Sequence, residues 1–317
     1  MHYLVTGGCG FIGSHFVRML FAEDASCEVT NIDLLTYAGR EENLADVAAA
    51  NGDRYHFVKS DIADSEALRA VFDAAQFDAV INFAAESFVD RSITDPGSFV
   101  QTNVVGTANM VELAREFGAP RLVQVSTDEV YGSLGDHDPP FNERSYLEPS
   151  SPYSASKASG DLLALAAHIT YGQDVVVTRC SNNYGPYQFP EKLIPLMINK
   201  ARADEPLPVY GDGKNVRDWI HVEDHCRGVL AALRSGKAGE VYNFGADCER
   251  TNLEIVHGIL SELGKPESLI TFVEDRPGHD WRYAIDSSKA RTDLGWLPAR
   301  DFETGLRETV DWYGAAG

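Results

Sequence analysis

The chain is short of cysteine, of long apolar runs and of basic residues. Its five cysteines lie far apart and form no C-x-x-C pair, so neither a disulfide scaffold nor a zinc site is expected. No apolar run approaches the ~18 residues of a membrane span, and no charged-then-apolar leader precedes the first strand pattern. These absences predict a cytoplasmic protein with reduced cysteines and no bound metal.

Basic residues number 27 against 48 acidic ones, which gives a formal net charge of −21. So acidic a surface repels phosphate backbones and anionic membranes, and this argues against a nucleic-acid or membrane partner. A small anionic ligand is still compatible with the composition, because a local group of arginines and backbone N–H groups can override the overall field. The 317 residues, 44% hydrophobic and 24% charged, are typical of a globular protein of two domains.

The first half of the sequence alternates short β-branched runs with longer amphipathic stretches. This alternation predicts βαβ units, and therefore a Rossmann-like, doubly wound parallel sheet with helices on both faces. The run Val175-Val176-Val177 is continuously apolar, as in a strand covered on both sides. The expected strands are 2–6, 28–32, 55–58, 79–82, 122–126 and 175–178, and the expected helices are 11–21, 64–75, 96–117 and 153–171.

Prolines become frequent after about Ser181, which indicates a second, loop-rich part. Within that part, a strand pattern at Asp218–Val222 and a helix pattern at Glu223–Arg234 are predicted to return to the first domain. The expected Rossmann domain is therefore residues 1–180 plus about 212–245. A smaller, discontinuous C-terminal domain would comprise about 181–211 and 246–317.

A glycine motif follows the first expected strand and opens the first expected helix. Gly7, Gly10 and Gly13 form the pattern G-x-x-G-x-x-G. In a dinucleotide site the first glycine allows the tight turn, the second the approach of a pyrophosphate, and the third the packing of helix on strand. The pyrophosphate then lies at the helix N-terminus. Such a motif alone is weak evidence, but its context here predicts dinucleotide binding.

Acidic residues at the ends of the next two expected strands extend this site. Asp33 lies ~20 residues beyond the glycines, where a carboxylate binds ribose hydroxyls and repels a 2′-phosphate, so NAD is expected rather than NADP. Asp61 fits two interpretations equally well: an adenine contact or the N-cap of the following helix. Small residues at 84–85 would let the cofactor pass over the sheet edge.

Tyr153 and Lys157 are spaced i, i+4 at the start of an expected helix, so their side chains share one face. We expect the lysine to lower the phenol pKa from ~10 and so make a tyrosinate available as a base. A chance surface pair is the alternative interpretation of Y-x-x-x-K. Together with the glycine motif, the pair resembles the extended short-chain dehydrogenase/reductase superfamily, which uses hydroxyls such as those of Ser126 and Thr127 to hold the substrate oxygen.

Asp128 and Glu129 follow directly, at the rim where α/β proteins bind ligands. A solvated acidic turn is the alternative. Two adjacent carboxyls do not both ionise cheaply, so we expect one to be a protonated acid and the other a base. An acid and a base beside a hydride carrier are suited to eliminating water next to a transient ketone.

With these residues the chain resembles the nucleoside-diphosphate-sugar 4,6-dehydratases, and among them the enzymes that act on dTDP-glucose. One departure is Phe88, where the family's A-A-E-S-H-V-D-R-S-I block usually has His. The matching blocks cover most of the chain: T-D-E-V-Y-G from Thr127, R-C-S-N-N-Y-G-P from Arg179, F-P-E-K-L-I-P from Phe189, residues 213–224, and D-R-P-G-H-D from Asp275.

The resemblance implies a division of roles. Catalysis would involve Thr127, Asp128, Glu129, Tyr153 and Lys157. The expected NAD contacts are Gly7, Gly10, Phe11, Ile12, Gly13, Asp33, Leu34, Leu35, Thr36, Asp61, Ile62, Phe83, Ala84, Ala85, Ser87, Thr102, Tyr153, Lys157 and Asn183. The expected nucleotide-sugar contacts are Ser87, Thr127, Asp128, Glu129, Asn182, Lys192, Leu193, Pro208, Tyr210, Arg217, Asn252, Arg276 and His279.

Other functions on the same fold are a nucleotide-sugar 4-epimerase or decarboxylase, and a non-catalytic NAD-sensing protein. The first two would lack the Thr-Asp-Glu trio, and the third would be expected to lose Tyr153 or Lys157. A homodimer is expected from the superfamily, through helices at 96–117 and 153–171.

Overall fold

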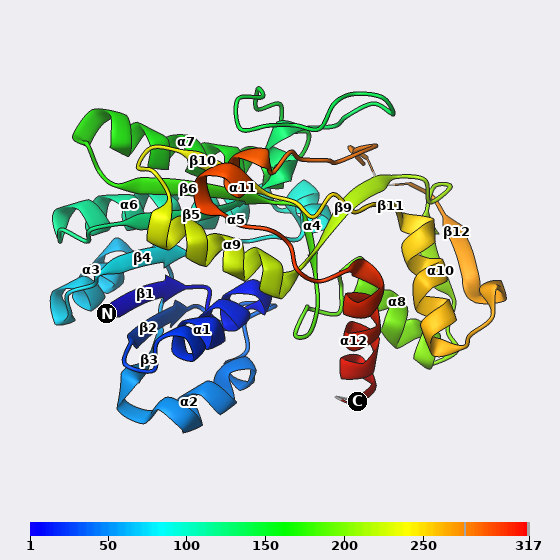
Figure 1. Ribbon diagram of the computed structural model, residues 1–317, viewed down its shortest axis with the longest axis horizontal. Coiled ribbons are helices and arrows are strands. Elements are labelled where there is room, and N and C mark those ends of the chain that lie inside the picture. The colour runs from blue at the N-terminus through cyan, green and yellow to red at the C-terminus, as the bar shows by residue number, and fades with distance from the viewer. Residues whose placement is uncertain (276, 316–317) are drawn as a thin grey trace.

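A computed structural model describes residues 1–275 and 277–315. Its centre is a seven-stranded sheet in the order β10-β6-β5-β4-β1-β2-β3, with every neighbouring pair parallel. The Rossmann-like, doubly wound α/β fold is therefore confirmed (Figure 1). The strands are β1 (His2–Thr6), β2 (Glu28–Asp33), β3 (Tyr55–Lys59), β4 (Ala79–Asn82), β5 (Leu122–Thr127), β6 (Val175–Cys180) and β10 (Val241–Phe244).

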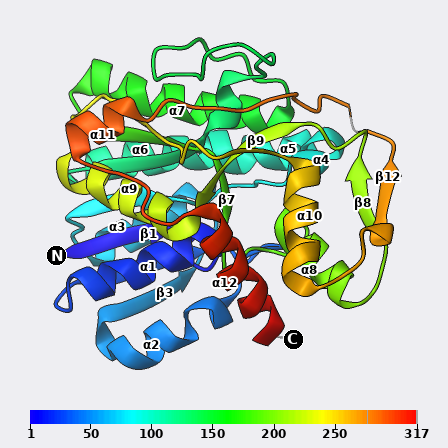
Figure 2. The ribbon, with the colours of Figure 1, turned by 45° about the vertical axis from the view of Figure 1, so that its right-hand side comes forward.

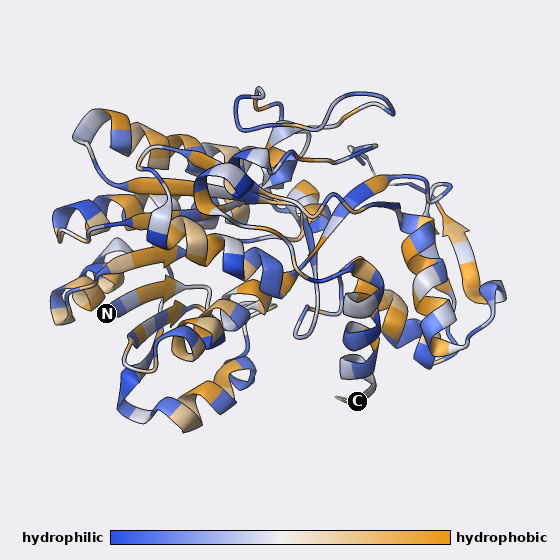
Figure 3. Ribbon diagram, viewed as in Figure 1, coloured by the Kyte–Doolittle hydropathy of each residue, from blue (hydrophilic) through white to orange (hydrophobic). Residues whose placement is uncertain are grey.

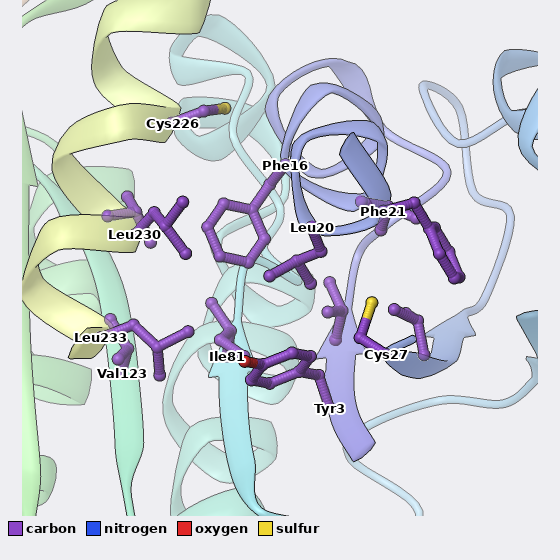
Figure 4. Packing of buried hydrophobic residues seen from close by; sticks show 14 of the residues in the cluster. Tyr3, Phe16, Leu20, Phe21, Cys27, Ile81, Val123, Cys226, Leu230 and Leu233 are labelled. Atoms are coloured by element: carbon purple, nitrogen blue, oxygen red, sulfur yellow. The ribbon is translucent and has the colours of Figure 1, made fainter. Parts of the chain in front are cut away.

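Helices cover both faces of this sheet (Figure 3), which explains why every residue of β4, β5, β6 and β10 is buried. On one face α1 (Phe11–Glu23), α2 (Ala45–Asn51) and α9 (Val222–Ser235) close a core with β1, β4 and β5. Figure 4 shows Phe16 and Leu20 of α1 meeting Leu230 of α9 over Ile81. The other face is covered by α3 (Ser65–Ala74), α6 (Thr107–Glu116) and α7 (Pro152–Tyr171).

A smaller lobe stands beside the carboxyl ends of the strands (Figures 1 and 2). It contains a three-stranded sheet, β11-β9-β7, and a parallel pair, β12-β8. Its core lies among α8, α10 and α12, where Ile198, Ile259 and Leu306 are buried. The elements are β7 (Asn182–Tyr184), α8 (Leu193–Arg202), β8 (Leu207–Tyr210), β9 (Val216–His221), β11 (Glu249–Thr251), α10 (Asn252–Leu263), β12 (Ile270–Val273) and α12 (Phe302–Ala315). The helix α11 (Ser288–Leu294) lies instead against α9 and β10 of the main domain.

Two expected elements differ in the structure. The helix expected at 96–117 consists of α5 (Pro96–Phe99), a π-helical turn (Val100–Gly106) and α6. A Cβ on Gly106 would lie 2.5 Å from Ile62, so this segment packs unusually close to its neighbours. The strand expected at Asp218–Val222 is β9, which pairs with β7 and β11 instead of joining the main sheet. Local pattern does not specify the pairing partner; here it is β10 that joins the main sheet, beside β6.

None of the helices in residues 1–275 and 277–315 combines the length and apolarity that crossing a membrane requires.

Candidate active site

A cleft runs along the carboxyl ends of β1, β2, β4 and β5 and is closed on the far side by the 180–192 segment. It includes the point where the strand order reverses, between β1 and β4, which is where open α/β sheets bind ligands. The cleft has a cavity volume of about 300 Å³, which lies at the lower end of the usual range for small-molecule pockets, about 300–1,000 Å³.

The glycine loop leaves the base of this cleft free of side chains. Gly7 has φ +68°, and a Cβ there would lie 2.7 Å from the backbone nitrogen of Ala84. A Cβ on Gly13 would lie 2.2 Å from the carbonyl oxygen of Gly7. At the N-cap Gly10, no side chain of the described residues caps α1, and its first turn carries no acid. These features fit a pyrophosphate on the backbone N–H groups of that turn.

Asp33 is held at the edge of the cleft by the glycine loop itself. Its carboxylate accepts hydrogen bonds from the backbone N–H groups of Cys9 at 2.9 Å and Leu35 at 2.8 Å. Burial raises the pKa of Asp33, while these two bonds act in the opposite direction. Asp61 also lines the cleft, and α3 is capped by Asp64 rather than by Asp61. Of the two interpretations of Asp61, the structure therefore favours a ligand contact over an N-cap.

Tyr153 and Lys157 both face the cleft from the first turns of α7. The expectation that Lys157 lowers the pKa of the Tyr153 phenol is wrong: the ammonium group binds a backbone carbonyl, and the phenol pKa is raised. Lys157 Nζ donates to the carbonyl of Val125 at 2.8 Å, and burial lowers the lysine's own pKa. Burial raises the pKa of Tyr153 well above its usual value, the charge of Glu129 raises it further, and a hydrogen bond with Thr127 opposes both.

The two carboxyls lie in a 3₁₀ turn (Asp128–Tyr131) that follows β5 without a gap. Thr127 caps this turn by accepting from the N–H of Glu129 at 3.3 Å. Asp128 is only 2% exposed, and its Oδ2 has no hydrogen-bond partner among the described residues. Burial, then the charges of Glu129 and Asp218, raise the pKa of Asp128 well above its usual value. The cleft thus contains a buried carboxyl with a raised pKa and a second carboxyl within electrostatic reach of Tyr153.

Comparison with known proteins shows which family the chain belongs to. A family model described as GDP-mannose 4,6 dehydratase matches residues 4–309. A dTDP-glucose 4,6-dehydratase of Xanthomonas campestris is 53% identical, covering 98% of this chain and 92% of the relative. A dTDP-glucose 4,6-dehydratase of Actinoplanes is 50% identical, covering 99% of this chain and 98% of the relative. The chain belongs to the dTDP-glucose 4,6-dehydratase family.

Solved structures agree with this family and also show how widely the fold is shared. A dTDP-glucose 4,6-dehydratase of Streptomyces venezuelae, crystallised with NAD and a second ligand, superimposes with a TM-score of 0.95 at 49% identity, covering 99% of this chain and 97% of that one. A UDP-glucose 4-epimerase of Thermotoga maritima superimposes with a TM-score of 0.92 at 29% identity, covering 100% of this chain and 99% of that one. The fold alone therefore does not distinguish a dehydratase from an epimerase, so the distinction depends on the residues of the site.

The structure brings together most residues that the dehydratase resemblance assigned. All expected NAD contacts except Leu35 line the cleft, and so do Ser87, Thr127, Asp128, Glu129, Asn182 and Lys192 from the expected substrate set. Leu35 has φ +56°, and its side chain packs against the core on the α1 face, so only its backbone serves the site.

The remaining expected substrate residues lie outside the cleft lining, in or beside the small lobe. Tyr210 and His279 are near each other, with ring centroids 6.1 Å apart. Arg217 donates to the carbonyl of Asp280 at 2.9 Å, and its charge lowers the pKa of Asp128, which connects it to the catalytic turn. Leu193, Pro208 and Asn252 complete this set, and Arg276 lies outside the described residues.

Sequence reasoning missed several residues that shape the site. Tyr37 lines the cleft and its hydroxyl lies 3.1 Å from that of Ser87. Glu191 lines it as well, and its side chain is hydrogen-bonded to Tyr37. Asn103 binds both backbone groups of Glu86 at 2.9 Å and the hydroxyl of Ser156 at 2.9 Å, so it fixes the β4 end against α7. The π-helical turn that presents Asn103 has no signature in the sequence that we recognised.

Proposed function

We propose that the residues of this cleft carry out the 4,6-dehydration of dTDP-glucose to dTDP-4-keto-6-deoxyglucose with bound NAD. Family membership makes the chain an NAD-dependent dTDP-glucose 4,6-dehydratase, a hydro-lyase. The observation that carries the assignment of roles is the buried Asp128 carboxyl, whose Oδ2 has no partner among the described residues, next to Glu129 in the cleft that Tyr153 also lines.

The glycine loop, Asp33 and Asp61 would hold the cofactor, with Asp33 on the ribose hydroxyls. When bound, NAD would supply reversible hydride transfer with the sugar. Tyr153 accepts the proton of the 4-hydroxyl while Thr127 holds O4. Burial disfavours the tyrosinate, and the hydrogen bond with Thr127 acts in its favour.

The ketone formed at C4 acidifies the proton at C5, and the two carboxyls then remove water. Glu129 takes the C5 proton. Asp128, whose raised pKa favours the protonated form, donates its proton to the 6-hydroxyl, so water rather than hydroxide leaves. Glu129 returns its proton to C5 as C6 is reduced, and the proton that Tyr153 took from the 4-hydroxyl balances the one that Asp128 gave to water. The net reaction loses one water and leaves the cofactor in its starting state.

Glu129→Gln tests this assignment. Glutamine keeps the size and hydrogen-bonding shape of the side chain but cannot accept the C5 proton. The variant should oxidise C4, visible as near-ultraviolet absorbance of the reduced cofactor, and should exchange no C5 hydrogen with deuterated water. Undiminished formation of the alkali-absorbing ketosugar would contradict the role of Glu129 as base.

The expected nucleotide contacts are proposed to bind the diphosphate and base from the small lobe, so that the Rossmann part holds NAD and the lobe holds the sugar nucleotide. Arg217 is a forked donor suited to a diphosphate. The buried thiols, none of them in a disulfide among the described residues, support a cytoplasmic location.

A homodimer is proposed through α7 and the π-helical turn before α6. On α7, Leu162 is 57% and Ile169 82% exposed, and Val100 of the π-helical turn is 51% exposed. Exposed apolar side chains of this kind are typical of a helix-to-helix interface. Ile169→Asp should shift the sedimentation of the protein to that of a monomer.

A further inference from the structure

Asn183 lies where the 180–192 segment lines the cleft. Two of the partners of its side chain, the carbonyl of Ser181 and the ring of His225, face different ends of the amide. Its Nδ2 donates to the carbonyl of Ser181 at 3.0 Å. Its Oδ1 lies 2.9 Å from Nδ1 of His225, the fourth residue of α9. A carbonyl oxygen only accepts hydrogen bonds, so the amide atom facing Ser181 must be the nitrogen.

This choice determines the protonation of the histidine. With the nitrogen of Asn183 toward Ser181, the atom facing His225 is the amide oxygen, which also only accepts. Nδ1 of His225 must therefore carry a hydrogen and donate it. The other ring nitrogen, Nε2, is buried and has no partner among the described residues. A bare lone pair there is cheaper than a buried N–H without an acceptor, and burial holds the pKa of His225 at about 3, so the ring is neutral.

His225 is well suited to fix a neighbour because its own position is fixed. The side chain is fully buried. The preceding residue, Asp224, accepts a hydrogen bond from Trp296 Nε1 on its carbonyl at 2.9 Å. The Asp224 carboxylate accepts two more, from the backbone N–H groups of Ala299 and Arg300. The ring thus stands on an anchored turn of α9.

We infer that His225 is a positioning residue, which orients the Asn183 amide so that this wall of the cleft offers a hydrogen-bond donor to an oxygen of the bound dinucleotide. Rotation of the amide by half a turn would place its oxygen against the Ser181 carbonyl and its nitrogen against the Nδ1 hydrogen. The second Nδ2 hydrogen is therefore kept available. The Asn183 side chain also forms a hydrogen bond with the Cys180 thiol, another group of the cleft wall. Sulfur is a weak acceptor, which a ligand oxygen can replace.

The inference rests on the proposed function only in that NAD occupies the cleft. The test is the rate at which the holoenzyme exchanges bound NAD for isotopically labelled NAD, which needs no turnover. His225→Phe keeps a planar ring but removes the donor. Loss of one neutral hydrogen bond should speed exchange about two- to tenfold. In an Asn183→Ala background the same substitution should change nothing, because the amide through which His225 acts is gone.

A purely structural role would give another pattern. If His225→Phe speeds exchange equally in both backgrounds, the inference is overturned. His221→Phe is the matched control: it removes a second buried imidazole, the cap of α9, and should lower the unfolding temperature with exchange at the wild-type rate.

A second pair of variants keeps the test available if the phenylalanine variant does not fold. Asparagine at 225 carries an N–H at the level of Nδ1, whereas glutamine carries it one bond further out. His225→Asn should therefore retain NAD better than His225→Gln, and equal retention by the two would overturn the inference. If the wild-type protein holds no NAD, the proposed function fails together with the inference. If the wild type holds NAD but the variants do not differ as expected, only the inference fails.

Discussion

Replacing Asp128 by asparagine should make the protein more stable while it destroys dehydration. Asparagine has the shape of the protonated carboxyl that the pocket contains. In the unfolded chain Asp128 ionises with its ordinary pKa of ~3.9, whereas burial and the neighbouring carboxylates raise that pKa well above its usual value in the fold. Between these two pKa values, wild-type unfolding releases a proton and the variant has none to release.

The sign and the slope follow from this difference. As pH rises above ~4, the free energy of unfolding contributed by Asp128 falls by ~1.4 kcal/mol per pH unit, until the pH reaches the pKa in the fold. The advantage of Asp128→Asn should therefore be absent in strong acid, grow with pH at that slope, and then level off.

Urea unfolding of both proteins at about pH 5, 6 and 7 measures this growth directly. The same preparations should show a loss of dehydration of roughly 10²–10⁴-fold, the usual contribution of a general acid. In a Glu129→Gln background the stability advantage of Asp128→Asn should stop increasing at a lower pH, because one of the charges that raise the Asp128 pKa has been removed. A stability difference that does not change with pH would mean that Asp128 is ionised in the fold, and its role as acid would fall.

Three further substitutions test other parts of the site. Tyr153→Phe should lower kcat by about 10²–10⁴-fold with KM nearly unchanged; a raised KM with intact kcat would make Tyr153 a binding residue. Asp33→Ala should weaken NAD retention without altering the fold, and calorimetry that finds NADP bound as tightly by the wild type would refute the expected preference. Arg179→Met removes the hydrogen-bonded counter-charge of Asp161, its buried partner at 2.9 Å, and should lower the free energy of unfolding by ~3–5 kcal/mol, measured by urea titration.

The sheet and the cofactor half of the site were predictable because local pattern specifies them. Strand and helix periodicity located β1 to β6 within a few residues, and the glycine spacing located the loop whose Gly13 permits no side chain. The carboxyl ends of parallel strands meet at one edge, so motifs at strand ends far apart in sequence had to come together. This is why Asp33, Thr127 and Tyr153 share one cleft.

The features that the sequence did not predict depend on contacts between segments far apart in the chain. Local pattern does not indicate which of these segments meet. The strand at Val216–His221 has the same buried pattern as a main-sheet strand, yet pairs with β7 and β11. The pKa of Tyr153 depends on where the flexible Lys157 side chain points, and that side chain donates to Val125. The orientation of Asn183 depends on α9, some forty residues further along the chain, in the His225 bond.

The comparison with the epimerase fold shows where the choice of reaction lies. The same fold serves a UDP-glucose 4-epimerase of 29% identity, with a TM-score of 0.92, so the fold alone does not determine which of the two reactions follows. Dehydration needs in addition an acid that keeps its proton at neutral pH and a base beside it. In the proposed mechanism the turn after β5 supplies both: Asp128 is 2% exposed and has a raised pKa, and Glu129, which is less buried and lines the cleft, is one of the charges that raise it. The proposal thus assigns the choice of water loss, on a shared fold, to two adjacent residues in different environments.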